Sequence, residues 1–98
     1  MTETQKLTCH TILEHYGVTS QLRRLIKECT ELINATSDVE WYGATTKTVY
    51  NLFSKIADVE IMIEQVKQCY YQCETDQIID DKLNRQLELI KKDEGAEK

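Results

Sequence analysis

Proline is absent from this chain, and glycine occurs only three times in its 98 residues. All-β sandwiches and barrels need more turn-forming residues than this, so the composition favours long helices. Long apolar runs are also missing, and a run such as Ile61-Met62-Ile63 is far too short to cross a membrane. The sequence therefore excludes a membrane-spanning segment. Residues 1–6 are polar and lack the apolar stretch of a signal peptide. We therefore expect a cytoplasmic protein.

An excess of basic residues is missing as well. The chain has 12 basic and 17 acidic residues, and its formal net charge is −5. This balance argues against binding to the backbone of DNA or RNA, which requires a basic face. It is compatible with a pocket for a single nucleotide, because a bound metal ion can bridge acidic side chains and phosphates. The length indicates one domain over residues 1–98, with residues 92–98 as a frayed charged tail.

The spacing of apolar residues predicts four helices, over about residues 3–15, 20–35, 45–72 and 74–91. Thr19 or Ser20 would cap the second helix, and Gly17 would end the first. Residues 34–43 are rich in turn-forming types and predict a loop that contains Trp41 and Tyr42. One face of the second helix carries an apolar stripe, which consists of Leu22, Leu25, Ile26, Cys29, Leu32 and Ile33.

The third predicted helix would be about 40 Å long and carries two apolar stripes. A compact chain of this size has a radius of gyration near 13 Å, so it cannot easily bury both stripes alone. We therefore predict an all-α bundle of about four helices that oligomerises through its long helices, as a homodimer or a homotetramer.

Three acidic residues are the strongest candidates for chemistry. Glu28 and Glu31 are three residues apart, so they are neighbours on one helix and can share a hard cation such as Mg²⁺. Asp58 lies between the two stripes of the third predicted helix, where an unpaired charge is costly. It requires either an ion-pair partner, such as Lys55 or an arginine, or a cation shared with Glu28 and Glu31. The alternative for the two glutamates is a solvated charged face.

Other side chains offer weaker alternatives. Cys69 and Cys73 are four residues apart and could bind zinc together with Cys9 and His10. Cysteine is also commonly buried as a small apolar residue, and we expect the cysteines to stay reduced. Trp41 and Tyr42 could either stack on a base or close the end of the bundle.

An ordered set of motifs resembles the MazG-like all-α nucleoside triphosphate pyrophosphohydrolases, in particular the short versions from phages and Gram-positive bacteria. It runs from about Ile12 to Ile90 and includes His15-Tyr16-Gly17, Gln21-Leu22, Glu28-Cys29-x-Glu31-Leu32-Ile33, Ile56-Ala57-Asp58-Val59-Glu60-Ile61-Met62 and Lys82-Leu83-Asn84-Arg85-Gln86-Leu87. The family pattern is ExxE, a spacer and then ExxD.

The resemblance implies Mg²⁺-dependent (or Mn²⁺-dependent) hydrolysis of a nucleoside triphosphate to the monophosphate and pyrophosphate. Glu28, Glu31 and Asp58 would be the catalytic metal ligands, and Lys82, Asn84 and Arg85 would contact the phosphates. A metal ion lowers the pKa of its bound water and neutralises charge that develops on the phosphates. Such enzymes are helical bundles that assemble as dimers or tetramers.

The chain departs from the family pattern at Lys55, where ExxD has its glutamate. Replacing −1 by +1 at ~6 Å from a divalent ion costs up to ~11 kcal/mol at an effective dielectric of ~20. Screening, or a lysine that swings outward, would reduce this cost. Two functions follow: a weak one-metal enzyme in which Lys55 contacts a phosphate oxygen, or a non-catalytic homologue. The latter would bind a nucleotide or a protein partner as an inhibitor or regulator, encoded by a phage. A third alternative is a purely structural helical dimer, with the three acids as ordinary surface groups.

Overall fold

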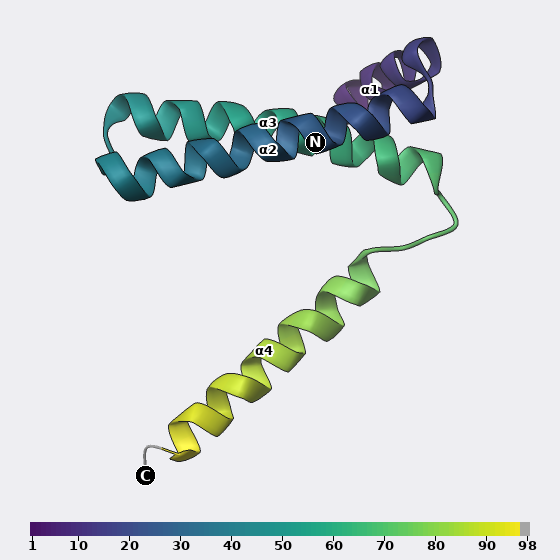
Figure 1. Ribbon diagram of the computed structural model, residues 1–98. Helices are drawn as coiled ribbons and strands as arrows, with labels where there is room; N and C mark the ends of the chain where they lie inside the picture. Colours follow the sequence, from purple (N-terminus) through teal and green to yellow (C-terminus); the bar gives the residue numbers. More distant parts are fainter. Residues whose placement is uncertain (97–98) are drawn as a thin grey trace.

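The computed structural model describes residues 1–96, and these residues form four helices and no strand. In chain order the helices are α1 (Glu3–Tyr16), α2 (Val18–Tyr42), α3 (Thr46–Cys69) and α4 (Asp76–Ala96), as Figure 1 shows. The predicted all-α class is therefore confirmed. None of these four helices is both long and apolar enough to cross a membrane.

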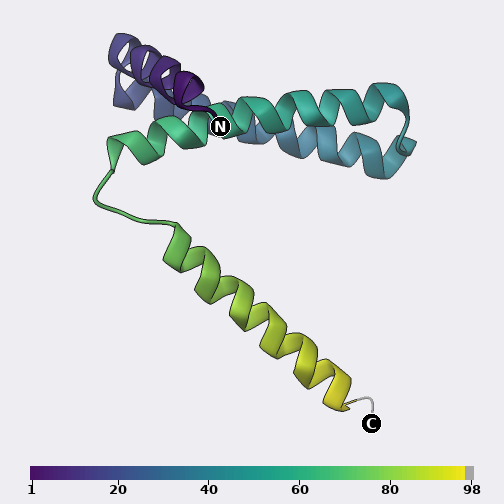
Figure 2. The same cartoon turned by 180° about the vertical axis from the view of Figure 1, so that it is seen from behind.

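Helices α2 and α3 form an antiparallel hairpin (Figures 1 and 2). They have 25 and 24 residues, so each is ~36 Å long at ~1.5 Å per residue. Gly43 ends α2 with φ 88° and ψ 168°, a backbone conformation essentially restricted to glycine. Thr45 then caps α3, because its side chain accepts a hydrogen bond from the Thr48 backbone amide. A glycine and a threonine thus set the sharp turn of the hairpin.

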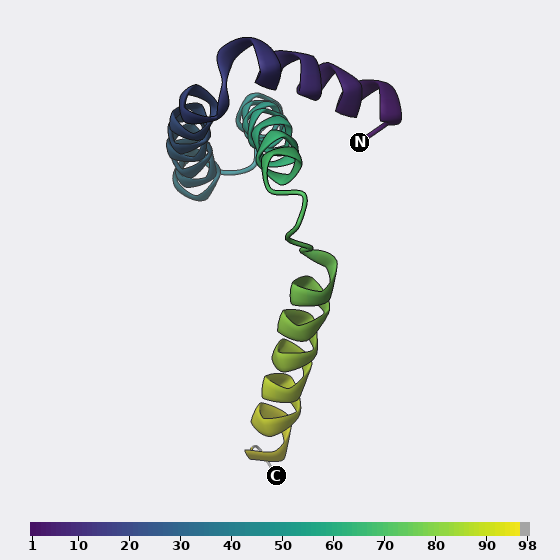
Figure 3. The same cartoon turned by 90° about the vertical axis from the view of Figure 1, so that its right-hand side faces the viewer.

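Helix α1 crosses one end of the hairpin (Figure 3). It begins at a capping box, in which the Thr2 side chain accepts from the Gln5 amide and the Gln5 side chain accepts from the Thr2 amide. It ends where predicted, at Gly17, which has φ 85° and leads directly into α2. Cys9 and Leu13 are the buried residues of α1. This helix therefore covers the end of the hairpin where α3 finishes.

Helix α4 stands apart from the other three helices, and no contact joins it to α1, α2 or α3 within residues 1–96 (Figure 1). The radius of gyration is 17.5 Å, against ~13 Å for a compact chain of this length. Apolar side chains on α4 are exposed, including Ile79, Leu83, Leu87 and Ile90. The helix continues to Ala96, beyond the predicted end at Lys91. Of the predicted frayed tail, residues 97–98 lie outside the described residues.

The predicted loop over residues 34–43 is wrong, because α2 continues without interruption to Tyr42. Polar residues cost only a few tenths of a kcal/mol each inside a helix, and packing easily offsets that. Ala35 is buried against the rest of the hairpin and Val39 is half-buried, while the Thr36 hydroxyl donates to the Leu32 carbonyl. The second helix also starts at Val18, so the predicted Thr19 or Ser20 cap is wrong, and α3 ends at Cys69 rather than at residue 72.

The contact line between α2 and α3 coincides only in part with the predicted apolar stripe, of which Leu22, Leu25, Cys29 and Leu32 are half-buried. On α2 the buried residues are Gln21, Glu28 and Ala35, each seven residues after the last. Two members of the predicted stripe, Ile26 and Ile33, are 68% and 65% exposed. On α3 the buried residues are Val59, Met62 and Gln65. Glu28 therefore faces α3, and the alternative of a solvated charged face does not hold for this glutamate.

Candidate metal centre

The three predicted acids come together on one side of the hairpin. Glu28 and Glu31 project from α2, and Asp58 projects from α3. Each offers a carboxylate oxygen, and these three oxygens lie within 4.8 Å of one another. Glu28 is buried, whereas Glu31 and Asp58 are half-buried. The structure therefore places all three predicted metal ligands in a single cluster.

The register of the hairpin explains this convergence. Gln21 Nε2 donates to Gln65 Oε1 at 2.7 Å, and this buried hydrogen bond pairs the start of α2 with the end of α3. Seven residues further along α2 is Glu28, and seven residues back along α3 is Asp58. Three further steps on each helix bring Glu31 opposite Lys55. Because both helices rise by the same distance per residue, the alignment that places Glu28 beside Asp58 also places Glu31 beside Lys55.

Glu28 is the most perturbed member of the cluster. Its side chain is only 9% exposed, and its Oε2 atom is buried without a hydrogen-bond partner. Burial raises the pKa of this carboxyl, and a hydrogen bond to Glu31 and the charges of Glu31 and Asp58 raise it further. Arg24, one turn earlier on α2, places its Nε 3.8 Å from Glu28 Oε1. A buried carboxylate oxygen without a donor is a position that a cation would satisfy.

Glu31 behaves in the opposite way. A hydrogen bond from Glu28 and another from Lys55 hold its pKa below the usual value for a glutamate. Lys55 Nζ lies 3.3 Å from Glu31 Oε2, and the two side chains are 28% and 34% exposed. Lys55 thus points into the cluster and forms an ion pair there. Without a bound cation, Lys55 neutralises part of the negative charge that Glu28, Glu31 and Asp58 bring together.

The donor set fits a hard divalent cation. All three candidate ligands are carboxylate oxygens, which Mg²⁺ and Mn²⁺ prefer over nitrogen or sulfur. Three carboxylates and one ammonium carry a net charge of −2 when all are ionised, which matches one divalent ion and not two. The unpartnered Oε2 of Glu28 supports the same conclusion. The cluster can therefore hold a single divalent cation through Glu28, Glu31 and Asp58.

The structure does not bring the other predicted ligand-binding residues to this cluster. Lys82, Asn84 and Arg85 lie on the separate helix α4, and all three are exposed. Trp41 and Tyr42 lie at the end of α2, 83% and 70% exposed. Trp41 is ten residues beyond Glu31, which corresponds to ~15 Å along the helix.

The alternative zinc site does not form. Cys69 is the last residue of α3, and Cys73 lies in the connection to α4. Within residues 1–96, no group of three His, Cys, Asp or Glu residues comes together other than the acidic cluster. Cys9 is instead packed against α3, where burial and the charge of Glu64 raise the pKa of its thiol.

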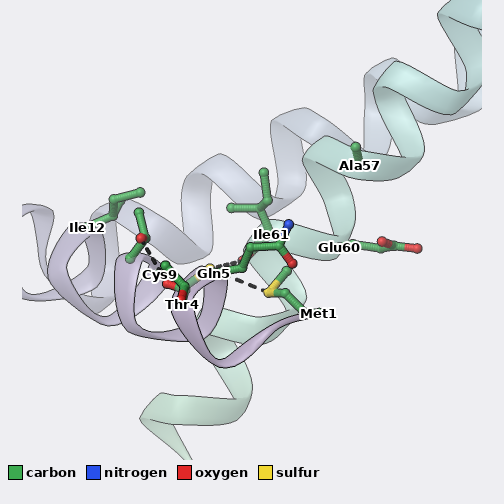
Figure 4. A pocket seen from close by; sticks show the side chains of 9 residues that line it. Met1, Thr4, Gln5, Cys9, Ile12, Ala57, Glu60 and Ile61 are labelled. Carbon is green, nitrogen blue, oxygen red and sulfur yellow. Dashed lines mark hydrogen bonds between the residues drawn. The ribbon is translucent and has the colours of Figure 1, made fainter.

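Two features of this region were not predicted. One is the contact of Arg24 with Glu28, which their i, i+4 spacing could have indicated. The other is a cavity of about 430 Å³ between α1 and α3. Figure 4 shows Cys9, Ile12 and Ile61 around it, with Glu60 on α3. This cavity is mainly apolar and offers a divalent cation fewer ligands than the acidic cluster.

A scan against models of protein families, a search of curated proteins and a search of solved structures each found no match. What the site can do therefore follows from its own side chains. These are three converging carboxylates, one of them buried and incompletely hydrogen-bonded, and one lysine held against them.

Proposed function

We propose that this chain is a Mg²⁺-dependent nucleoside triphosphate pyrophosphohydrolase of low activity that uses one metal ion. The reaction adds water to the α-phosphorus and breaks its bond to the bridging oxygen, which gives a nucleoside monophosphate and pyrophosphate. The observation that carries the proposal is the convergence of Glu28, Glu31 and Asp58 within 4.8 Å. Membership of the MazG-like family and action in the cytoplasm belong to the same proposal. The motif order and the helical hairpin that positions both motifs support it.

Each polar side chain of the cluster has a part in this reaction. Glu28, Glu31 and Asp58 would hold the cation. A bound Mg²⁺ supplies Lewis acidity towards the phosphate oxygens and acidifies a coordinated water. Lys55 would contact a phosphate oxygen, because its ammonium is the nearest mobile positive charge to Glu31.

The test is pyrophosphate release from a panel of ribo- and deoxyribonucleoside triphosphates with Mg²⁺ and with Mn²⁺. We expect slow turnover by the wild type and at least a hundredfold loss in Asp58→Asn and Glu31→Gln. Asp38→Asn is a matched control, because Asp38 is an exposed acid on α2 outside the cluster. Turnover that survives Asp58→Asn would contradict the proposal.

The ion pair between Lys55 and Glu31 favours a second candidate function. It places a positive charge where the family pattern has an acid, and this lowers the affinity for metal. In this alternative the chain binds a nucleotide or a protein partner without catalysis, as an inhibitor or regulator. An inactive wild type combined with an active Lys55→Glu variant would support it. Calorimetry with a nucleoside triphosphate and Mg²⁺ would then show binding without pyrophosphate release.

We further propose that two copies associate through an apolar face of the α2–α3 hairpin. A helix turns by ~100° per residue, so Glu31 lies to one side of the contact line through Glu28, and Cys29 and Ile33 lie to the other. On α3, Asp58 and Phe53 are likewise separated by the line through Val59. Because the acids meet on one side, the apolar residues share the opposite side of the hairpin. This apolar face comprises Leu22, Ile26, Cys29, Ile33, Val49, Phe53 and Ile56.

The size of the apolar face fits a second copy of this chain. Two helices ~36 Å long and together ~20 Å wide offer about 700 Å², close to the ~800 Å² per partner of a stable interface. Ile26, Ile33 and Phe53 are 68%, 65% and 63% exposed in the single chain. The face can pair with itself about a two-fold axis, which leaves both acidic clusters on the outside.

Light scattering after size exclusion tests this assembly. The wild type should have the mass of a dimer, or of a tetramer if α4 also pairs, and Phe53→Glu should be a monomer. Tyr71→Glu is the matched control, because Tyr71 is 78% exposed but lies outside the apolar face. A monomeric wild type would contradict the assembly without affecting the proposed chemistry.

A further inference from the structure

Lys55 is a cation that the protein itself holds at the acidic cluster. Its Nζ lies 3.3 Å from Glu31 Oε2, and its side chain is 28% exposed, so most of it is covered by the hairpin. Glu31 is at the same time one of the three carboxylates that offer an oxygen to a metal ion. Lys55 and a metal ion would therefore compete for the same carboxylate.

This competition has a definite electrostatic outcome. A divalent cation and an ammonium on one carboxylate would be ~5 Å apart or less, and at an effective dielectric of ~20 their repulsion is roughly ten times thermal energy. The metal ion also has the better set of partners, because the buried and unpartnered Oε2 of Glu28 and the carboxylate of Asp58 are available to it. The lysine has a flexible four-carbon stem and a partly exposed path to solvent. Binding of the cation would thus move the ammonium away from Glu31.

We propose that binding of a divalent cation to Glu28, Glu31 and Asp58 releases Lys55 from Glu31, and that the released ammonium then binds a phosphate oxygen of the ligand. Cation and phosphate therefore bind cooperatively, with Lys55 as the residue that couples them. The inference rests on the proposed metal site and goes beyond it by assigning the coupling to one side chain. By linkage, the factor by which phosphate tightens cation binding equals the factor by which the cation tightens phosphate binding.

The experiment measures Mn²⁺ binding by electron paramagnetic resonance, with and without inorganic phosphate, on the full chain. Free Mn²⁺ is calibrated in matched solutions that lack protein, which accounts for the Mn²⁺ that phosphate itself binds. The variants are Lys55→Met, which keeps the apolar stem and removes the charge, and Lys67→Met as a control. Lys67 is an exposed lysine on the same helix, outside the cluster. Circular dichroism confirms that each variant is folded.

Without phosphate, Lys55→Met should bind Mn²⁺ about tenfold more tightly than the wild type, because no ion pair has to be broken and no like charge remains. With phosphate, the affinity of the wild type for Mn²⁺ should increase about tenfold, and that of Lys55→Met should not change. Lys67→Met should match the wild type in both conditions. Equal Mn²⁺ affinity of Lys55→Met and wild type, or a phosphate effect that persists in Lys55→Met, would overturn the inference.

A second measurement on the wild type does not depend on a variant. The NMR signals of the Lys55 side chain should shift on addition of Mg²⁺, whereas those of Lys67 should stay in place. An unchanged Lys55 signal at saturating Mg²⁺ would also overturn the inference. The two proposals fail separately: Mn²⁺ binding without an effect of Lys55 refutes the coupling alone. The complete absence of Mn²⁺ binding refutes the metal site and the proposed enzyme together.

Discussion

Replacing Glu28 by glutamine should stabilise the protein at neutral pH when no divalent metal is present. A buried acceptor without a partner costs about 1–3 kcal/mol, and Glu28 Oε2 is such an acceptor. Glutamine keeps the shape of the side chain, and its neutral amide removes the cost of burying a charge at this position. The variant loses the contact of Arg24 with Glu28 at 3.8 Å. Because this contact is long and the arginine is 54% exposed, it contributes at most ~1 kcal/mol. We expect a net gain of about 1 kcal/mol.

The gain should depend on pH in a defined direction. The pKa of Glu28 is raised in the folded chain, mainly by burial, so the folded state keeps this proton to a higher pH than the unfolded state does. The cost of ionising Glu28 is therefore absent in acid, develops above the ordinary glutamate pKa of ~4.3, and is complete once the pH exceeds the folded pKa. The pKa of Glu31 is lowered in the folded chain, so its ionised form stabilises the fold, and this stabilisation is lost as the pH falls through the folded pKa. Glu28→Gln should thus resemble the wild type near pH 3 and exceed it at pH 7.

Thermal unfolding followed by circular dichroism at one protein concentration measures this effect. For a domain of this size, 1 kcal/mol corresponds to ~4–8 °C in Tm. Glu40→Gln, an exposed glutamate on α2, should not shift Tm. Saturating Mn²⁺ should reverse the ranking, because a cation at 100 times its Kd stabilises the wild type by ~2.7 kcal/mol, and the variant lacks one ligand. A lower Tm for Glu28→Gln at pH 7 in a chelating buffer would refute the reasoning.

Three further substitutions test the hairpin. Gln21→Leu should cost about 1–3 kcal/mol in urea unfolding, because it leaves the buried Gln65 Oε1 without its donor; the double variant with Gln65→Leu should recover most of this loss, and additive losses would contradict the pairing. Gly43→Ala should cost about 1–3 kcal/mol by the same measurement, because alanine is strained at a φ of 88°. The added methyl group would meet no neighbouring atom, so any loss comes from the backbone conformation alone, and an unchanged midpoint would contradict that conformation. Trp41→Ala should change the free energy of unfolding by less than ~0.5 kcal/mol, since the side chain is 83% exposed. Weaker nucleotide binding by that stable variant would support base stacking, and unchanged binding would exclude it.

The acidic cluster could be predicted from the sequence because each half of it is local. Glu28 and Glu31 are helical neighbours by their spacing alone, and Asp58 is an acid between two apolar stripes. The orientation of Lys55 could not be predicted, because it depends on the register between two helices that are distant in sequence. A shift of one residue on α3 would turn Lys55 by ~100°, away from Glu31. Lys55, whose role separates the two candidate functions, can therefore be placed only from the folded hairpin.

The errors in the helix assignment have different physical causes. Residues 34–42 are helical because each polar residue costs little, while Ala35 and Val39 gain packing against the hairpin. The fully buried residues of α2 are Gln21, Glu28 and Ala35, and none of them belongs to the predicted apolar stripe of this helix. A small residue and a hydrogen-bonded glutamine let the helices approach, and the larger Ile26 and Ile33 point outwards. Hydrophobic periodicity identifies an apolar stripe on a helix, but it does not identify the helix or the second copy of the chain that packs against this stripe.

The polar residues on the contact line also explain why the cluster forms in this register. An apolar interface tolerates a slip of one helical turn, because one aliphatic side chain can replace another. The hydrogen bond from Gln21 Nε2 to Gln65 Oε1 does not tolerate such a slip, since both side chains are at least 98% buried and a slip would leave this acceptor without its donor. A slip of four residues along α3 would place Met62 opposite Glu28 and separate the three acids. The buried amide pair, ~10 Å along α2 from Glu28, thus stabilises the one alignment in which Glu28, Glu31, Asp58 and Lys55 meet. Loss of that pair should therefore reduce Mn²⁺ affinity together with stability, although neither glutamine contributes a ligand to the cluster.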